Sequence, residues 1–298
     1  MFRRRSADPT AWPVRKIRAL LIAAVVAGLA VVAGLVLAVV YTVHPEGATH
    51  TAPARQSRLT AAASARPSTT YARDGVTGAG VTAPTPDPRE VLADQPMPEA
   101  DADAAHPAPV SPTAVPAVIT LPRPTRTGTA GVPTGFPATP AGALAQLAAI
   151  DQVAIESASM DQARAVIDGW TMRGGPTSAT WSVAAAVAQL LTAAGRSSGP
   201  DPLAVVLTPV MGLIKGSVGN DFVVPCVDFE LDVTLAQTAR GAVADCQRMV
   251  WNPGPGPAGG RWMIGPGPEA ATPPAVWPDT ATAVGVGYAD LRVPEATR

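Results

Sequence analysis

FVVPCVDFELDVTL, at residues 222–235, alternates two sets of side chains. The first set consists of Val223, Pro225, Val227, Phe229, Leu231 and Val233, and the second of Val224, Cys226, Asp228, Glu230 and Asp232. Successive side chains of a β-strand point to opposite faces of its sheet. We therefore predict a strand with one face in the core and the other face acidic.

Three carboxylates share the second face of this strand: Asp228, Glu230 and Asp232. The simplest interpretation is a solvated sheet face that Arg248 partly neutralises across a hairpin. The functional alternatives are oxygen ligands for Ca²⁺ and a surface for a basic partner. Because Ca²⁺ sites normally gather their ligands from a curled loop, we predict no metal site and keep these residues as a partner-facing acidic strand.

Three amphipathic segments precede the strand and predict helices. The first begins at Thr139, a good N-cap, and Pro140, which suits the first helical position. The apolar positions of the three segments are Leu144, Leu147, Ile150 and Ala154; Ala163, Val166, Ile167 and Trp170; and Val183, Val187, Leu190 and Leu191. These stripes recur at helical spacing, and Gly195 is the expected stop of the third helix. Trp170 and Trp181 are predicted to be packing residues.

Further strands are predicted on both sides of residues 222–235. Leu203–Ile214 is an apolar run broken by Pro209, typical of a bent buried or edge strand or of a short helix. Ala242–Trp251 and Arg261–Ile264 predict two more strands, and Asp279 is expected to cap a short helix with Val284, Tyr288 and Leu291 on one side. Three helices followed by a curved antiparallel sheet predict an α+β domain over residues 135–298.

The apolar run Ala19–Val43 predicts a transmembrane helix. About 25 residues at 1.5 Å each span roughly 37 Å, more than the ~30 Å hydrocarbon core. The nearby basic residues all lie in the tail 1–18, so the N-terminus is expected in the cytoplasm and residues 44–298 outside it. The alternative, a cleavable signal peptide, would have a shorter apolar region. We predict a single-pass protein of the cell membrane, in contact with the lipid bilayer, whose C-terminal domain is extracellular.

Residues 44–134 are rich in proline, alanine and threonine and contain few large apolar side chains. Such a segment cannot bury enough surface to offset its conformational entropy, so we predict a disordered linker with polyproline II character. The formal net charge of the chain is −1. Outside the basic tail the sequence has no cluster of basic residues of the kind that binds nucleic acid, so direct binding to nucleic acid is not expected.

Cys226 and Cys246 are the two cysteines of the chain. Because the predicted topology places both in an oxidising compartment, we predict a disulfide. In an antiparallel hairpin, Cys226 opposite Cys246 needs a turn near residue 236, whereas Arg248 opposite Glu230 needs a turn near 239. The segment Thr238–Gly241 resembles a turn and favours the second register, although a bulge or a long bend would restore the first.

No catalytic constellation is expected in residues 135–298. The histidines are His44, His50 and His106, all in the predicted linker, which excludes Ser-His-Asp catalysis, Cys-His catalysis and the usual zinc site from the domain. Gly212–Ser217 does not meet the phosphate-loop pattern, and Gly285–Gly287 lacks the third glycine of a dinucleotide fingerprint. We predict a protein that is not an enzyme and that needs no cofactor.

Several segments carry a family resemblance: GFPATPAGALAQLAAI at 135–150, FVVPCVDFELDV at 222–233, ADCQRMVW at 244–251, GGRWMIGPGPEAA at 259–271 and VWPD at 276–279. They resemble single-pass membrane proteins of high-GC Gram-positive bacteria, domains of unknown function often encoded with conjugation or integrative-element genes. The wider similarity is to extracytoplasmic scaffold domains of conjugation channels. It implies a cone of the nuclear transport factor 2-like type and carries over no active site. Those scaffolds commonly have a second such domain, whereas this chain has room for one.

The expected function is a membrane-anchored extracytoplasmic scaffold or accessory component of a conjugative DNA-transfer apparatus, which acts by protein–protein interaction. Its expected partners are other envelope or transfer-apparatus proteins, together with self-association. The alternative is a cell-envelope ligand-binding protein or cell-wall adaptor that is not linked to conjugation.

Overall fold

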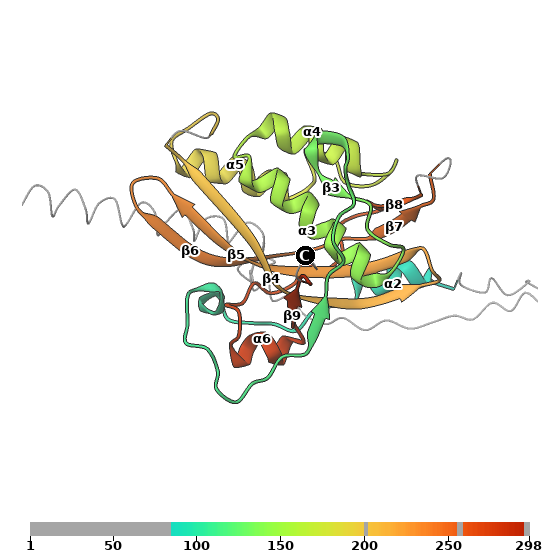
Figure 1. Ribbon diagram of the computed structural model, residues 1–298, viewed down its shortest axis with the longest axis horizontal. Coiled ribbons are helices and arrows are strands. Elements are labelled where there is room, and N and C mark those ends of the chain that lie inside the picture. The colour runs from blue at the N-terminus through green and yellow to red at the C-terminus, as the bar shows by residue number, and fades with distance from the viewer. Residues whose placement is uncertain (1–84, 200–201, 255–258, 295–298) are drawn as a thin grey trace, which may run out of the picture.

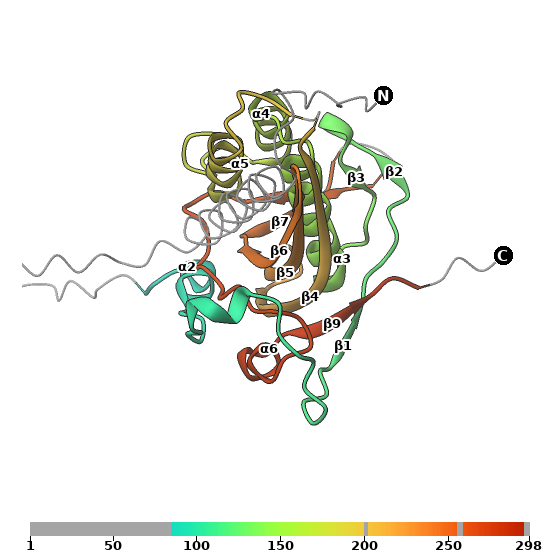
Figure 2. The ribbon, with the colours of Figure 1, turned by 90° about the vertical axis from the view of Figure 1, so that its left-hand side faces the viewer.

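The computed structural model describes residues 85–199, 202–254 and 259–294. These residues form an α+β domain in which a curved, mainly antiparallel sheet lies between a helical layer and a layer of loops and short helices (Figures 1 and 2). The predicted transmembrane run 19–43 lies outside the described residues. Within them, no helix is both long enough and apolar enough to cross a bilayer.

The sheet has seven strands in the order β1-β9-β4-β5-β7-β8, with β6 paired to β5 beside β7. The strands are β1 (Val118–Thr120), β4 (Ala204–Val218), β5 (Phe222–Thr234), β6 (Thr238–Cys246), β7 (Met249–Asn252), β8 (Arg261–Ile264) and β9 (Ala289–Arg292). All pairs are antiparallel except β1 with β9. β2 (Arg126–Thr127) and β3 (Pro133–Thr134) form a separate two-stranded sheet around the 3-10 turn η2 (Thr129–Gly131).

The stretch 222–235 forms the central strand, as its alternation predicts, and the run at 203–214 is a strand rather than a helix. β4 has a register shift between Pro209 and Met211, so the proline is accommodated at an irregularity of the ladder. The predicted single strand 242–251 is wrong, because the structure has β6 and β7 there. Both pair with the same edge of β5, and Gln247 and Arg248 separate them.

The turn between β5 and β6 lies at Leu235–Gln237, so Thr238–Gly241 is strand and the turn predicted there is wrong. Thr234 is opposite Thr238, and their hydroxyl oxygens lie 2.7 Å apart. This register places Cys226 directly opposite Cys246, with Cα atoms 4.1 Å apart and sulfur atoms at disulfide distance. The disulfide prediction is therefore confirmed, through the register that the sequence favoured less.

The three predicted helices are present as α3 (Pro140–Glu156), α4 (Met160–Trp170) and α5 (Ser182–Ala193). Thr139 caps α3 by accepting a hydrogen bond from Gly142 N at 3.1 Å, and Pro140 follows it in the first turn. α3 lies against β4 and β5 beneath α4 and α5. It is buried on most sides, at 12 of its 17 residues, which makes it the central helix of the domain.

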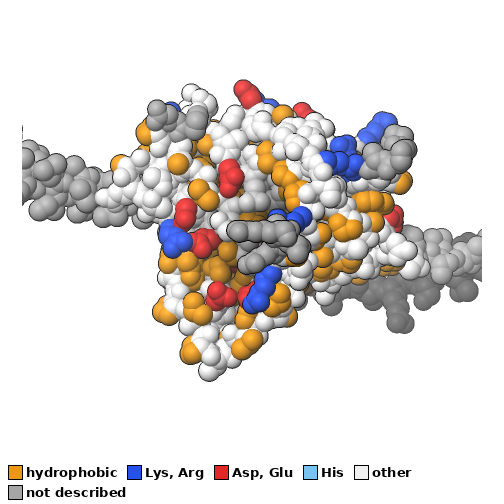
Figure 3. Space-filling model, viewed as in Figure 1, with side chains coloured by type: hydrophobic (Ala, Val, Ile, Leu, Met, Phe, Trp, Pro, Cys, Tyr) orange, Lys and Arg blue, Asp and Glu red, His pale blue; other side chains and the backbone are white. Residues whose placement is uncertain are grey.

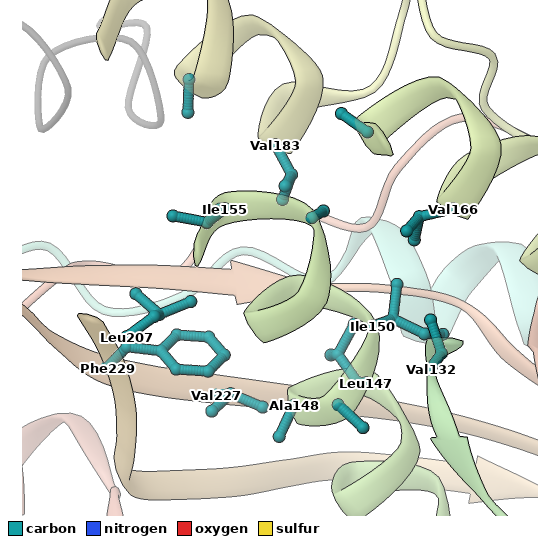
Figure 4. Close-up of a cluster of buried hydrophobic side chains, with 14 of the residues drawn as sticks. Val132, Leu147, Ala148, Ile150, Ile155, Val166, Val183, Leu207, Val227 and Phe229 are labelled. Atoms are coloured by element: carbon teal, nitrogen blue, oxygen red, sulfur yellow. The ribbon is translucent and has the colours of Figure 1, made fainter. Parts of the chain in front are cut away.

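The main core lies between this helical layer and one face of the sheet (Figure 4). Leu147 and Ile150 of α3 face Val227 and Phe229 of β5, and all four side chains are fully buried or nearly so. Trp170 and Trp181 are also buried in this core, which confirms their prediction as packing residues.

The opposite face of the sheet is also covered, and the predicted linker supplies part of the cover. α2 (Pro88–Asp94) and the 3-10 turn η1 (Ala102–Ala105) pack there with the C-terminal segment, beside a second cluster that includes Phe222, Val224 and both cysteines. The prediction of a disordered linker is thus wrong for residues 85–134; residues 44–84 lie outside the described residues. As a result, His106 belongs to the ordered part of the chain.

The C-terminal helix differs from its prediction. α6 (Ala281–Val286) is capped by Thr280, which accepts a hydrogen bond from Ala283 N at 3.2 Å. Asp279 has φ 58°, a left-handed conformation instead of the extended one of an N-cap. The helix ends at Val286 with Gly287 as its C-cap, so Tyr288 follows it and Leu291 belongs to β9.

Arg248 holds α2 against the sheet. Its side chain is 2% exposed and its guanidinium lies 2.8 Å from Glu90 and 3.1 Å from Asp94. A Cβ atom at Gly267, which has φ 99°, would lie 2.9 Å from this guanidinium, so the glycine leaves room for it. A second pair links Arg89 of the same helix to Asp221 at 2.9 Å, but it is more exposed.

We expect Arg248→Met to release α2 and Arg89→Met to do so far less. Charge-assisted hydrogen bonds are each worth roughly 1.5–3 kcal/mol, whereas exposed pairs contribute about 0–1 kcal/mol. Amide hydrogen exchange in α2 should therefore accelerate at least ~tenfold in the first variant and less than ~fivefold in the second. Equal exchange rates in the two variants would contradict an anchoring role for Arg248.

Candidate functional site

The predicted partner-facing acidic strand does not present its three carboxylates together. Asp228 is fully buried, and its Oδ1 accepts a hydrogen bond from Val276 N at 3.3 Å. Its Oδ2 has no hydrogen-bond partner among the described residues. Burial raises the pKa of Asp228 well above its usual value, against the opposing effect of the Val276 N–H. Only Glu230 and Asp232 of the predicted set reach the surface.

These two carboxylates are neutralised by Arg240 and not, as predicted, by Arg248. Arg240 lies opposite Asp232 in the ladder; its Nε donates to Asp232 at 2.7 Å, and it also forms an ion pair with Glu230. Its guanidinium carbon lies 5.6 Å from the centre of the Trp277 ring. The turn at 235–237 explains why Arg240 replaces Arg248 as the partner of these carboxylates. In the resulting register, Arg240 lies on this face of the sheet and Arg248 lies beside α2.

A mixed patch results where β4, β5 and β6 run side by side. Val206 of β4, Asp232 of β5 and Arg240 of β6 are register partners in one row, and Thr208 and Glu230 are partners in the next. We call these five residues the β4–β6 patch. Val206 is 51% exposed. At the β6 end of the molecule, acidic and basic side chains lie together beside apolar ones (Figure 3).

The backbone edge of β4 beside this patch is blocked at Leu207. The side chain of Gln152 in α3 donates to Leu207 O at 2.8 Å, and Glu156 accepts from Leu207 N at 2.9 Å. These bonds occupy the groups that an added strand would use. A partner is therefore expected to contact side chains of the β4–β6 patch and not the strand edge at this residue.

A second cluster of carboxylates lies between the helices and the sheet, with two members buried and Glu269 partly exposed. It consists of Asp151 in α3, Asp245 in β6 and Glu269 after β8. Glu269 accepts hydrogen bonds from Ser182 N and Ser182 Oγ, both at 3.0 Å, and from Gln247 Nε2 at 2.9 Å. Gln247 also donates to Asp245 at 3.1 Å. Neither oxygen of Asp151 has a hydrogen-bond partner among the described residues.

The pKa values of two of these acids are strongly raised. For Asp151, burial is the main cause, and the charges of Asp245 and Glu269 act in the same direction. For Asp245, burial and the charge of Glu269 raise the pKa to about 8, in spite of hydrogen bonds from Gln247 and from Cys246 N. Around neutral pH the cluster therefore holds protons that exposed aspartates would have lost.

This cluster was not predicted from the sequence, although a signal was present. Asp151 lies four residues after Leu147 and seven after Leu144, on the apolar stripe of its helix. Asp245 and Glu269 carried no such signal, because only the tertiary fold brings their strand and loop to α3. Within the described residues no group of three or more His, Cys, Asp or Glu side chains is arranged to hold a metal ion. The chemistry that the cluster offers is the retention of protons.

A hollow of about 240 Å³ opens at the β7–β8 end of the molecule. Its lining residues are Arg126, Asn252, Gly254, Gly259, Gly260 and Arg261. Arg126 comes from β2 and donates from Nη2 to Gly260 O at 2.9 Å. The guanidinium carbon of Arg261 lies 5.0 Å from the centre of the Trp170 ring. Figure 3 shows basic side chains gathered at this end of the molecule.

Comparison of the chain with known protein families, with curated proteins and with solved structures finds no match.

Proposed function

We propose that this protein is a membrane-anchored extracytoplasmic scaffold that acts by protein–protein interaction, as an accessory component of a conjugative DNA-transfer apparatus. The proposal includes a cone of the nuclear transport factor 2-like type, with α3, α4 and α5 packed on one face of the curved sheet. The link to conjugation is supported by the family resemblance of the segments at 135–150, 222–233, 244–251, 259–271 and 276–279.

The observation that carries the location is the buried cysteine pair. Cys226 and Cys246 are both almost inaccessible, and they face each other across adjacent strands at disulfide distance. Structural disulfides persist in oxidising compartments outside the cytoplasm. The apolar run 19–43, with its basic residues on the N-terminal side, favours the same side of the membrane for the domain.

The β4–β6 patch supports a role in protein–protein interaction. It joins an exposed valine to a carboxylate pair and an arginine, on a sheet that packing holds rigid on its other face. Apolar contact with charged groups around it is typical of interface surfaces. We propose that a partner docks on this patch through its own apolar and basic side chains.

We expect a photo-crosslinking side chain at Val206 to capture a partner in intact cells. The full-length chain would carry p-benzoylphenylalanine at position 206 or, as a control, at Val115, which is 84% exposed and lies outside the patch. Ultraviolet light should give a discrete crosslinked species at position 206 and not at 115. Mass spectrometry would then identify the captured protein.

The identity of the captured protein separates the two candidate functions. A transfer-apparatus protein or a second copy of this chain, together with at least ~tenfold less conjugative transfer in cells that lack the gene, would support the scaffold. Capture of a cell-wall enzyme, with transfer unchanged, would support the alternative of a cell-wall adaptor. Equal labelling from positions 206 and 115 would contradict a specific surface.

A further inference from the structure

The hollow beside β2 and the facing ends of β7 and β8 has a basic lining. Among the described residues that line it, the charged side chains are Arg126 and Arg261, and none is an aspartate or glutamate. Both arginines are half-buried, so their charges are less screened by water than those of fully exposed side chains. A small hollow with this charge favours an anion.

Arg126 is held at the wall of the hollow. Its Nη2 donates to the carbonyl oxygen of Gly260, which fixes the orientation of the guanidinium. A Cβ atom at Gly260 would lie 2.4 Å from Asn252 O and 2.7 Å from the ring of Trp251. Only glycine therefore fits at this position, whose carbonyl oxygen accepts the bond from Arg126.

Arg261 is held in a different way, by an aromatic ring. Its guanidinium lies over Trp170, which is fully buried and is itself fixed by a hydrogen bond of 3.0 Å from Nε1 to Thr129 O. No carboxylate of the described residues forms a salt bridge with Arg261. A guanidinium held over an aromatic ring by a cation–π contact still has N–H donors for hydrogen bonds to a planar or tetrahedral oxyanion.

The size of the hollow limits what it can hold. At about 240 Å³ it is smaller than the ~300–1,000 Å³ typical of pockets for drug-sized ligands. It suits a single charged group, and two arginines at its wall suit the oxygens of a phosphate.

We propose that this hollow is a binding site for a phosphate group, held by Arg126 and Arg261. The group comes either from a free phosphate compound or from the headgroup of an anionic phospholipid. The site is separate from the β4–β6 patch and does not depend on the scaffold function.

The test uses the full-length chain in a neutral detergent. Its thermal midpoint is measured against inorganic phosphate at constant ionic strength, with chloride as the balancing ion. A second titration uses water-soluble dihexanoyl phosphatidylglycerol, with dihexanoyl phosphatidylcholine as the zwitterionic control. A ligand that binds only the folded state raises the midpoint and saturates as the site fills.

We expect a saturable rise in the midpoint with phosphate, and at least ~tenfold weaker binding in Arg126→Gln and in Arg261→Gln. Arg261→Lys should weaken binding less, because lysine keeps the positive charge and loses only the paired N–H donors of the planar guanidinium. Arg164→Gln is the matched control: it removes the same charge from an exposed arginine paired with Asp161 on α4, and it should bind like the wild type. If a variant has a lower midpoint in the absence of ligand, its binding constant, and not its midpoint, is compared with that of the wild type. A loss of stability is then not counted as a loss of binding.

The lipid arm identifies the source of the phosphate group. Tighter binding of phosphatidylglycerol than of phosphate, with no response to phosphatidylcholine, would assign the site to a lipid headgroup. Saturable phosphate binding without tighter binding of the lipid would assign it to a free phosphate compound. If neither ligand gives a saturable response, or if the glutamine variants bind like the wild type, the proposal is overturned.

Discussion

Reduction of the Cys226–Cys246 disulfide should lower the free energy of unfolding by roughly 3 kcal/mol. The two cysteines are 20 residues apart, and closing a loop of that length removes about this much conformational entropy from the unfolded chain. For a domain of about 200 residues, this corresponds to a thermal midpoint roughly 6–12 °C lower. The measurement compares the midpoint of the full-length chain with and without a strong thiol reductant.

The variant Cys226→Ala/Cys246→Ala provides the control for this experiment. Its midpoint should resemble that of the reduced protein, because it lacks the crosslink in every condition, and reductant should not change it further. Thiol alkylation after unfolding without reductant gives an independent measurement. Labelling of both cysteines in the untreated wild type would contradict the disulfide.

The fold was predictable where local patterns matched local structure. The alternation at 222–235 and the apolar stripes of α3, α4 and α5 depend on neighbours within a few residues, and the structure has those elements. The register of β5 with β6 was not predictable in this way. Both Leu235–Gln237 and Thr238–Gly241 could form a turn, and the choice between them exchanges the roles of Arg240 and Arg248.

The predicted linker shows a second limit of the sequence. Residues 85–134 contain few large apolar side chains, so their composition resembles that of disordered chains. They are ordered because other parts of the domain contact them. Arg248 forms ion pairs with Glu90 and Asp94. Leu92 packs against Gly216, where an added Cβ atom would lie 2.9 Å from Leu92 Cδ1. Such long-range contacts leave no periodic signal in the segment itself.

The candidate sites likewise have parts that local sequence predicts and parts that depend on long-range contacts. The sequence predicted Asp228, Glu230 and Asp232 as a partner-facing surface, and of these Glu230 and Asp232 are partly exposed whereas Asp228 is buried. It could not show that the segment around Val276 covers Asp228, because that segment is 48 residues away. The hollow lined by Arg126 and Arg261 likewise depends on a long-range contact, because Arg126 donates to Gly260, 134 residues away.

The buried carboxylates should make the domain less stable as the pH rises. The folded state keeps protons on Asp151, Asp228 and Asp245 at pH values where the unfolded chain has lost them. Because the folded state binds more protons in this range, the free energy of unfolding falls between about pH 4, the usual pKa of an aspartate, and about pH 8, the raised pKa of Asp245. We expect a fall of several kcal/mol over this interval, measured by denaturant unfolding with the disulfide intact.

Asp151→Asn should remove a large part of this pH dependence. The amide has the shape of the protonated acid and cannot ionise, so the variant should match the wild type below about pH 4, where the unfolded chain also keeps its proton, and exceed its stability at pH 9 by roughly 2 kcal/mol or more. Asp168→Asn, an exposed position on α4, is the matched control and should follow the wild-type profile. If Asp151→Asn kept the full wild-type slope, or destabilised the domain equally at both pH values, Asp151 would not be the protonated member of the cluster. A flattened slope would show that a buried, protonated carboxyl on the central helix α3 ties the stability of the domain to the pH of its compartment.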